Sequence, residues 1–291
     1  MKRLIVTADD FGRAEPVNEA VEDAHKRGIL TAASLMVAEE GFADAVERAR
    51  SMPGLAIGLH ITLVDGKPVL PPSDIPDLVD RSGRFSSQLV RLGTKIYFDR
   101  HTREQVVREL RAQFEMFRTT GLRLGHVDSH HHYHLHPTVF DIILDLAQEY
   151  DVPAIRLPWE PPLISWRAQR QAAGRRVMNG LFHWHRLRRM RRKAQAAGLL
   201  VNDRAFGLND SGAMDATRLL GFLENLPPGL NEIYCHPATR RWADHPMPVS
   251  YRSVDEYLAL IDPVVTTALI RHHITLTSFP LEAAARGNGQ A

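Results

Sequence analysis

The sequence predicts an α/β fold, an irregular (β/α) barrel of about seven parallel strands. Short apolar runs alternate with segments of helical spacing along the 291 residues. Four of the expected strands also end in ionisable residues: Asp9-Asp10, His60, Asp128-Ser129-His130 and Cys235-His236. Because parallel barrels place functional residues at the C-terminal ends of their strands, this repeated placement favours a barrel over an open, doubly wound sheet.

The expected elements follow one another along the chain. Branched and apolar residues fill the expected buried strands, at 3–8, 32–37, 55–61, 124–128, 154–157, 232–235 and 274–278. Apolar residues at helical spacing mark the expected helices, at 15–26, 42–50, 103–119, 138–150, 215–226 and 254–269. The stretch 64–102 holds several prolines and glycines, so we expect an irregular excursion over one end of the barrel.

We expect one domain over residues 1–283, with a basic helical insert at about 161–202 and a frayed tail at 284–291. Cys235 is the single cysteine, so an intrachain disulfide is excluded. The first apolar run is stopped by Asp9, too early for a signal peptide, and no window approaches the roughly 18 apolar residues of a membrane span. The expected location is the cytoplasm, with peripheral contact at the inner membrane surface as an extension.

The stretch 126–136 holds six of the fifteen histidines. Imidazole together with carboxylate is the usual ligand set for zinc and similar divalent ions. The alternative is a solvated histidine-rich loop. Not all six side chains can bind one ion, so we assign His132 and His134 to substrate contacts.

Four further residues have both a functional and a structural interpretation. The pair Asp9-Asp10 can divide its work between binding a metal and accepting a proton, or it can cap a helix. His236 follows an apolar strand and can protonate a departing amine, although a lone histidine is often structural. Arg156 can hold a substrate group by a bidentate contact, or it can be an ordinary surface arginine.

Four segments together resemble the YdjC-like carbohydrate deacetylases, which include chitooligosaccharide deacetylase. They are Thr-Ala-Asp-Asp-Phe-Gly at 7–12, Gly-Leu-His-Ile-Thr-Leu at 58–63, His-Val-Asp-Ser-His-His-His at 126–132 and Cys-His-Pro at 235–237. The resemblance implies an irregular barrel related to other polysaccharide deacetylases. It implies that Asp10, His60 and His130 bind the metal, that Asp9 is the base and that His236 is the acid. The subgroup that this chain most resembles is the hopanoid-biosynthesis-associated deacetylases.

The expected cofactor is one divalent ion, Zn²⁺ or Mg²⁺. A set of two histidines and one carboxylate suits zinc or a neighbouring transition metal better than Mg²⁺, which favours oxygen ligands.

The segment between Glu160 and Asp203 contains no acidic residue. Removing its ten basic residues from the formal net charge of +2 leaves −8 for the rest of the chain. A basic helix with aromatic residues suits an anionic membrane surface, and we expect peripheral contact through 167–193. The alternatives are a helix packed on the barrel and a nucleic-acid surface; no nucleic acid is expected. The ten residues are Arg167, Arg170, Arg175, Arg176, Arg186, Arg188, Arg189, Arg191, Arg192 and Lys193.

The expected function is that of a metal-dependent hydrolase that removes an acetyl group from an N-acetylated sugar. The resemblance extends this to a glycolipid substrate, an N-acetylglucosaminyl lipid of hopanoid biosynthesis. Two alternatives stay open: a metal-dependent phosphoesterase, and a non-enzymatic protein that binds metal or nucleic acid.

Overall fold

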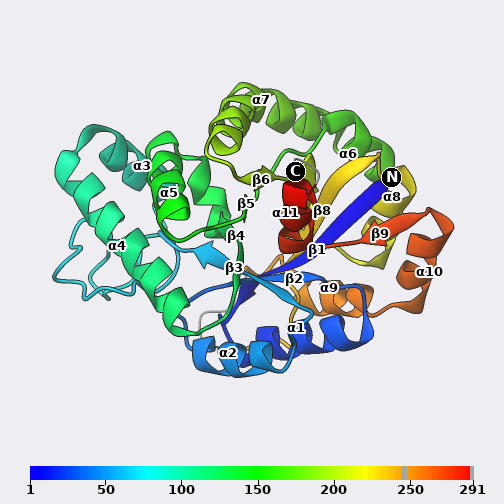
Figure 1. Cartoon of the computed structure of the whole chain (residues 1–291), viewed down its shortest axis with the longest axis horizontal. Coiled ribbons are helices and arrows are strands. Elements are labelled where there is room, and N and C mark those ends of the chain that lie inside the picture. Colours follow the sequence, from blue (N-terminus) through cyan, green and yellow to red (C-terminus); the bar gives the residue numbers. More distant parts are fainter. Residues whose placement is uncertain (244–247, 289–291) are drawn as a thin grey trace.

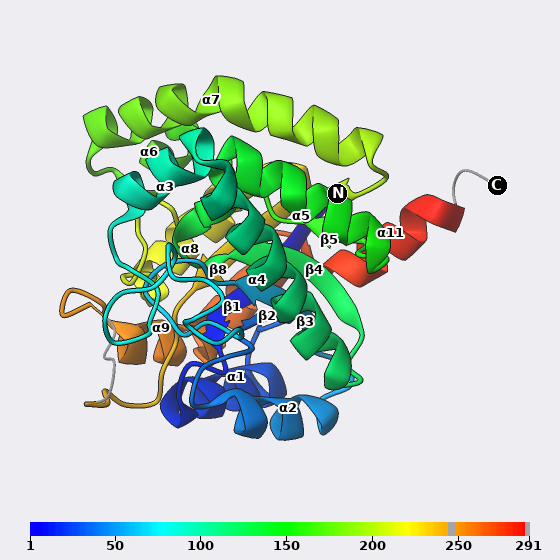
Figure 2. The same cartoon turned by 90° about the vertical axis from the view of Figure 1, so that its left-hand side faces the viewer.

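The computed structural model describes residues 1–243 and 248–288 (Figure 1). Its centre is a sheet of parallel strands in the order β6-β5-β4-β3-β2-β1-β8-β7, with β9 paired to β1. Helices surround this sheet, with α7 on one side and α1 and α2 on the opposite side (Figure 2). The predicted α/β class with parallel strands is confirmed. The strands are β1 Lys2–Phe11, β2 Ala32–Leu35, β3 Ala56–Ile61, β4 Leu124–Ser129, β5 Ala154–Ile155, β6 Leu200–Val201, β7 Arg204–Phe206, β8 Gly229–Cys235 and β9 Ile274–Leu276.

Helices connect most of the successive strands, which gives the α/β alternation. A short 3-10 segment, η1, follows β4 directly and carries most of the histidine-rich stretch. The helices are α1 Glu15–Arg27, α2 Phe42–Arg50, α3 Leu89–Phe98, α4 Arg100–Thr119, α5 Pro137–Glu149, α6 Pro162–Gln169, α7 Ala173–Ala196, α8 Ala216–Asn225, α9 Ser253–Leu260, α10 Pro263–Arg271 and α11 Phe279–Asn288; η1 spans His130–Leu135.

The sheet is an open half-barrel, since no strand ladder joins β6 to β7 within the described ranges. The segment that follows β5 bridges these two edges. The side chain of Asn202 bonds to both the N–H and the carbonyl of Leu157, at 2.8 and 2.9 Å. The backbone N–H of Ala205 donates to the carbonyl of Trp159 at 2.9 Å. Loop contacts, and not a strand ladder, therefore connect the two edges of the half-barrel.

Several boundaries differ from the prediction. The expected insert at 161–202 forms α6 and α7 and connects β5 to the parallel strand β6, so it is the crossover that such a pair requires. The expected helix over 254–269 is two helices, because Pro263 starts a new one that the Asp262 carboxylate caps. The expected tail is helical as far as Asn288, and residues 289–291 lie outside the described residues.

The excursion between β3 and α4 is tied down by a buried polar stripe on α4. Gln105, Glu109 and Gln113 lie one helical turn apart and are almost completely buried. Glu109 accepts the backbone N–H groups of Val69 and Leu70 at 2.9 and 3.0 Å. Gln105 and Gln113 accept those of residues 77 and 62 in the same way. The excursion expected to be irregular is thus held at fixed points, and it also contains α3.

Candidate metal centre and active site

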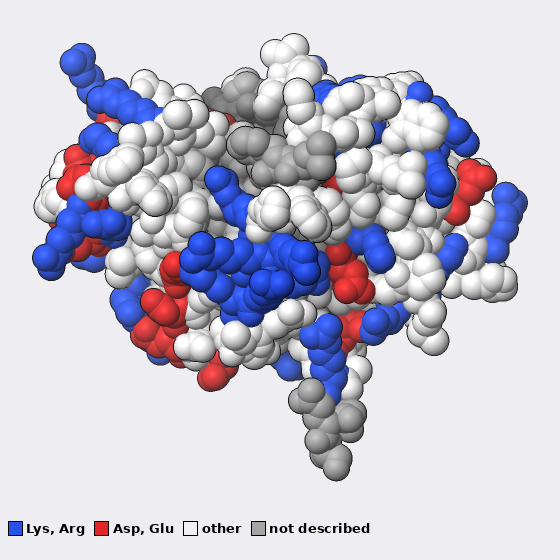
Figure 3. Space-filling view, turned by 90° about the horizontal axis from the view of Figure 1, so that it is seen from above, with Lys and Arg blue, Asp and Glu red and all other residues white. Residues whose placement is uncertain are grey.

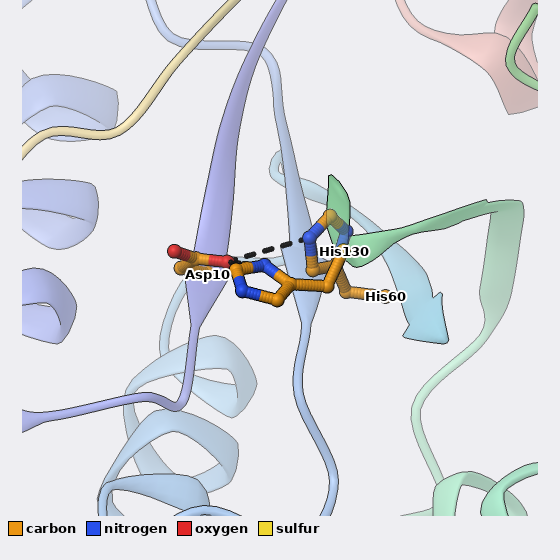
Figure 4. Close-up of side chains that lie close together, drawn as sticks. All are labelled: Asp10, His60 and His130. Atoms are coloured by element: carbon orange, nitrogen blue, oxygen red, sulfur yellow. Dashed lines mark ion pairs between the residues drawn. The ribbon is translucent and has the colours of Figure 1, made fainter. Parts of the chain in front are cut away.

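Three predicted metal ligands converge at the C-terminal ends of their strands (Figure 4). The Asp10 Oδ1 atom lies 2.9 Å from His130 Nδ1 and 3.4 Å from His60 Nε2. One ligand atom from each of the three residues lies within 4.8 Å of the others, and all three side chains are buried. Residues that are 50 and 70 positions apart in sequence therefore form one compact cluster, as their strand-end positions predicted.

A break in the pleat lets two adjacent carboxylates reach this cluster. Successive side chains of a regular strand point to opposite faces. The pairing of β1 with β2 shifts register between Ala8 and Phe11, and Asp10 has a φ of 64°. Such a left-handed conformation in a non-glycine residue costs about 1–3 kcal/mol and is characteristic of functional sites. As a result, Asp9 and Asp10 both line one cavity.

Asp128 at the end of β4 orients His60. Its Oδ1 atom lies 2.7 Å from His60 Nδ1, which leaves Nε2 of the same ring facing Asp10. Its Oδ2 atom accepts a hydrogen bond from Ser34 at 2.8 Å. A carboxylate behind a histidine fixes the ring and its tautomer, which is the usual support of a metal-binding imidazole. Asp128 therefore belongs to the support of the site.

Arg156 is placed differently from the prediction. It is completely buried and does not line the cavity, so its guanidinium does not face the space where a substrate would bind. Its Nη1 atom lies 2.7 Å from Asp9 Oδ2 and 2.6 Å from Asp128 Oδ2, and its Nε donates to Glu232 at 2.9 Å. Burial opposes its charge, but Asp128 and Asp9 outweigh that effect and raise the pKa of Arg156. This location indicates that Arg156 positions the carboxylates of Asp9 and Asp128 from the buried side of the site.

The two histidines assigned to the substrate are separated by the turn of η1. His132 lines the cavity, and its Nε2 atom lies 2.8 Å from the hydroxyl of Tyr234. His134 is completely buried, with Nδ1 2.6 Å from Ser129 Oγ, and does not line the cavity. The reason is the left-handed backbone of residues 131 and 132, with φ of 53° and 52°, which turns the chain inward after His132.

The cavity has a volume of about 240 Å³ and contains both predicted catalytic residues. The Oδ1 atom of Asp9 and the Nδ1 atom of His236 are buried and have no hydrogen-bond partner in the described part of the chain. Glu256 of α9 accepts the backbone N–H groups of Met214 and His236, which fixes the turn that carries His236. The lining residues are Asp9, Asp10, Arg13, His60, Asp65, Ser129, His130, His131, His132, Leu208, Ser211, Tyr234, His236, Pro248 and Tyr251.

Four ionisable lining residues escaped the sequence analysis: Arg13, Asp65, Tyr234 and Tyr251. Tyr234 could have been predicted from the sequence, because it lies two residues before His236 and the period of a strand places both side chains on one face. The other three lie on loops, for which no periodicity exists.

The charges around the cluster favour a cation. Burial raises the pKa of Asp10, but His130 and Arg13 outweigh it, so its pKa lies well below the ordinary value. Burial lowers the pKa of His130 to about 4, which leaves this imidazole neutral and able to bind a metal. Burial also acts to lower the pKa of His60, but Asp128 and Asp10 raise it to about 10. The carboxylates of Asp10 and Asp128 thus stabilise a positive charge on His60, at the position where a metal ion can bind.

The donor set fits a divalent ion. Two imidazole nitrogens and one carboxylate oxygen suit zinc or a related transition metal. The Asp10 Oδ1 atom is buried, and among the described residues it has no hydrogen-bond partner. A second group, Asp65 with His130 and His131, also lies close together. However, the guanidinium of Arg13 lies 3.3 Å from His130 Nε2, so a fixed positive charge already occupies the approach to that second group.

The comparisons with known proteins identify the family of the chain. A family model described as YdjC-like protein matches residues 3–271. A protein of Brevibacillus brevis named carbohydrate deacetylase is 45% identical over 157 residues, or 54% of this chain and 60% of that protein. A protein of Thermoanaerobacter pseudethanolicus with the same name is 30% identical over 239 residues, or 82% of each.

Several of these matches are partial. Four of the curated relatives are matched over only 57% to 63% of their own length. Among solved structures, a protein of Enterococcus faecalis whose name refers to cellobiose-phosphate cleavage is 29% identical, with a TM-score of 0.73. That match covers 96% of this chain and 97% of the other. The family match over residues 3–271 and the 30% identical relative show that this chain belongs to the family of YdjC-like proteins.

Proposed function

We propose that this chain is a divalent-metal-dependent hydrolase that removes an acetyl group from an N-acetylated sugar. The observation that carries the proposal is the buried cluster of Asp10, His60 and His130, with Asp9 and His236 facing the same cavity. The carbohydrate deacetylase name of two relatives supports the choice of reaction.

The two catalytic residues act on the two protons of amide hydrolysis. Asp9 takes a proton from the attacking water through its free Oδ1 atom, while Arg156 holds the Oδ2 atom and keeps the carboxylate oriented. His236 gives a proton to the nitrogen of the sugar as the bond between carbonyl carbon and nitrogen breaks. The products are acetate and a free amino sugar. A divalent ion held by Asp10, His60 and His130 supplies Lewis acidity at this place when it is bound.

Release of acetate tests this reaction directly. N-acetylglucosamine conjugates are offered to the protein after chelation and after addition of Zn²⁺ or Mg²⁺, and acetate and phosphate are both measured. We expect acetate release that chelation abolishes and metal restores. Asp10→Ala serves as the metal-site variant, because it removes the carboxylate shared by both imidazole contacts. Phosphate release from a phosphorylated sugar without acetate release would instead favour the phosphoesterase alternative.

We further propose that the substrate is linked to a lipid and that α7 contacts an anionic membrane surface. The apolar side chains Val177, Met178 and Trp184 of α7 are exposed, whereas Leu187, Met190 and Ala194, further along the helix, are buried. Figure 3 views the face that carries α7 and shows a dense group of basic side chains at its centre. Lipid-facing apolar residues beside basic ones are typical of interfacial helices.

Not all ten basic residues of the segment contribute to this surface. Arg176 is buried, where it forms a bidentate pair with Asp210 at 2.8 Å. Arg191 is partly buried and donates to two backbone carbonyls, and Lys193 is paired with Asp141. The exposed basic residues in the second half of α7 are Arg186, Arg188, Arg189 and Arg192. No helix within the described ranges is long and apolar enough to cross a bilayer, so the proposed contact is a surface contact.

Charge reversal tests the membrane contact. Arg188, Arg189 and Arg192 are replaced together by Glu, and a matched variant carries the same three reversals at Arg100, Arg111 and Arg118 of α4. Each basic residue near an anionic surface contributes about 1 kcal/mol. We therefore expect the α7 variant to bind anionic liposomes at least about a hundredfold more weakly than the α4 variant, and to lose turnover of a lipid-linked sugar but not of a soluble one. Equal binding by both variants would contradict the contact.

A further inference from the structure

Tyr234 and His132 form a polar pair in the cavity that the reaction scheme above does not use. Tyr234 lies on β8, two residues before His236, and only 2% of it is exposed. The guanidinium of Arg156 lies 4.8 Å from the centre of its ring and fixes it from the buried side. Its hydroxyl lies 2.8 Å from His132 Nε2, and both residues line the cavity.

The protons of this pair can be assigned from its surroundings. The imidazole of His132 carries a proton on Nδ1, on Nε2 or on both. Its Nδ1 atom is buried and has no partner among the described residues. A proton on Nδ1 would leave a buried N–H unpaired, which is rarer in folded proteins than an unpaired acceptor. The proton therefore lies on Nε2 and is donated to the Tyr234 oxygen.

This assignment leaves the phenolic proton of Tyr234 free. A phenol that accepts one hydrogen bond still has its own O–H to donate. Tyr234 lines the cavity that also contains Asp9 and His236. Burial raises the pKa of Tyr234 well above its ordinary value, so the hydroxyl remains a donor at neutral pH.

We propose that Tyr234 donates a hydrogen bond to the acetyl oxygen of the substrate as that oxygen gains negative charge, and that His132 is the positioning residue that aims the hydroxyl. The inference rests on the deacetylation proposed above. A donor aimed at an oxygen that becomes anionic typically contributes about 10²–10³-fold to kcat. Tyr234 keeps its proton throughout, so no bond to hydrogen is broken at this residue.

The kinetic test compares two phenol deletions. Tyr234→Phe should lower kcat for acetate release about 10²–10³-fold with KM changed less than about threefold, because the bond forms mainly in the transition state. Tyr257→Phe is the matched control, since its hydroxyl bonds to Asp23 outside the cavity. Metal content and melting temperature are measured for both variants. A Tyr234→Phe enzyme with kcat within threefold of the wild type, or with an effect on KM alone, would overturn the inference.

The role of His132 has its own test. His132→Gln keeps an N–H donor near the position of Nε2 and should retain activity within about tenfold, whereas His132→Leu should lose as much as Tyr234→Phe. The double variant Tyr234→Phe/His132→Leu should be no slower than either single one, because both remove the same hydrogen bond to the substrate. Additive losses would show that His132 acts by another route.

Acetate binding separates this inference from the proposed reaction. The metal-loaded protein is titrated with acetate by calorimetry, because acetate carries the same oxygen with full charge. The dissociation constant should rise about tenfold or more in Tyr234→Phe and stay unchanged in Tyr257→Phe. If the wild type binds acetate in this way but releases none from any sugar, the proposed reaction fails, while the hydrogen bond from Tyr234 to a bound carboxylate oxygen is still shown. If Tyr234→Phe binds acetate like the wild type, the inference fails whatever the reaction is.

Discussion

Two completely buried histidines outside the metal cluster should make the fold sensitive to acid. His126 packs against Gly58 and the ring of Phe279, and the Nδ1 atom of His134 lies 2.6 Å from Ser129 Oγ. Burial is the first cause that lowers the pKa of each ring, from 6.5 to about 4. The unfolded chain therefore binds protons between pH 6.5 and 4 that the folded chain does not bind. Stability is present above pH 6.5 and is lost as the pH falls toward 4.

The size of the loss follows from the shifts. A difference of one pKa unit corresponds to about 1.4 kcal/mol, so each histidine withdraws about 3 kcal/mol when the pH has fallen well below 4. In the middle of the window each contributes a slope of about 1.4 kcal/mol per pH unit. Two such groups remove about 6–7 kcal/mol, which is comparable to the whole stability of an ordinary domain of about 5–15 kcal/mol.

Urea unfolding of the chelated protein at several values between pH 7 and pH 4.5 measures this effect. His126→Gln removes one titrating group and should flatten the pH dependence by about 1.4 kcal/mol per unit. Ser34→Ala is the control, because it removes the 3.1 Å contact to His126 Nε2 but keeps the imidazole, so its curve should be displaced without a change in slope. Identical slopes for the wild type and His126→Gln would refute the reasoning.

Three further predictions concern the site and its support. Asp9→Asn should keep the bound metal, measured by elemental analysis, while acetate release falls about 10²–10⁴-fold; loss of metal would mean that Asp9 and Asp10 have exchanged roles. Arg156→Met should lower the free energy of unfolding by about 3–5 kcal/mol in a denaturant titration, because it leaves buried carboxylates unpaired; an unchanged midpoint would contradict that pairing. Gly58→Ala should cost at least about 1–3 kcal/mol, since its Cβ would lie 2.3 Å from the His126 ring, and wild-type stability would show that the ring can move aside.

The sequence predicted the fold class and the meeting of Asp10, His60 and His130 because both depend on strand ends. Parallel strands bring their C-terminal ends to one edge, so the position along the chain is enough to predict proximity. The two short strands β6 and β7 were missed, because two or three residues are too few to show a period.

The sequence does not predict in the same way how deep a side chain lies relative to the cavity. Arg156 and His134 both lie close to strand ends, but the sequence does not tell whether a side chain there points into the cavity or beneath it. The positive φ values of His131 and His132 decide the matter for η1, and nothing in the composition of a run of histidines predicts them. Arg176 is a similar case: its acidic partners, Glu160 and Asp210, lie outside the basic segment.

The buried polar stripe on α4 holds the path of the excursion between β3 and α4 mainly through backbone groups of the excursion. Gln105, Glu109 and Gln113 recognise backbone N–H groups, which every residue except proline provides. The exposed side chains of that excursion can therefore change while its path is kept. Asp65, at the rim of the cavity, belongs to this excursion. Evolution or a designer could diversify the exposed residues within 64–80 to accept different substrates on one unaltered scaffold, provided that proline is kept out of positions 69, 70 and 77.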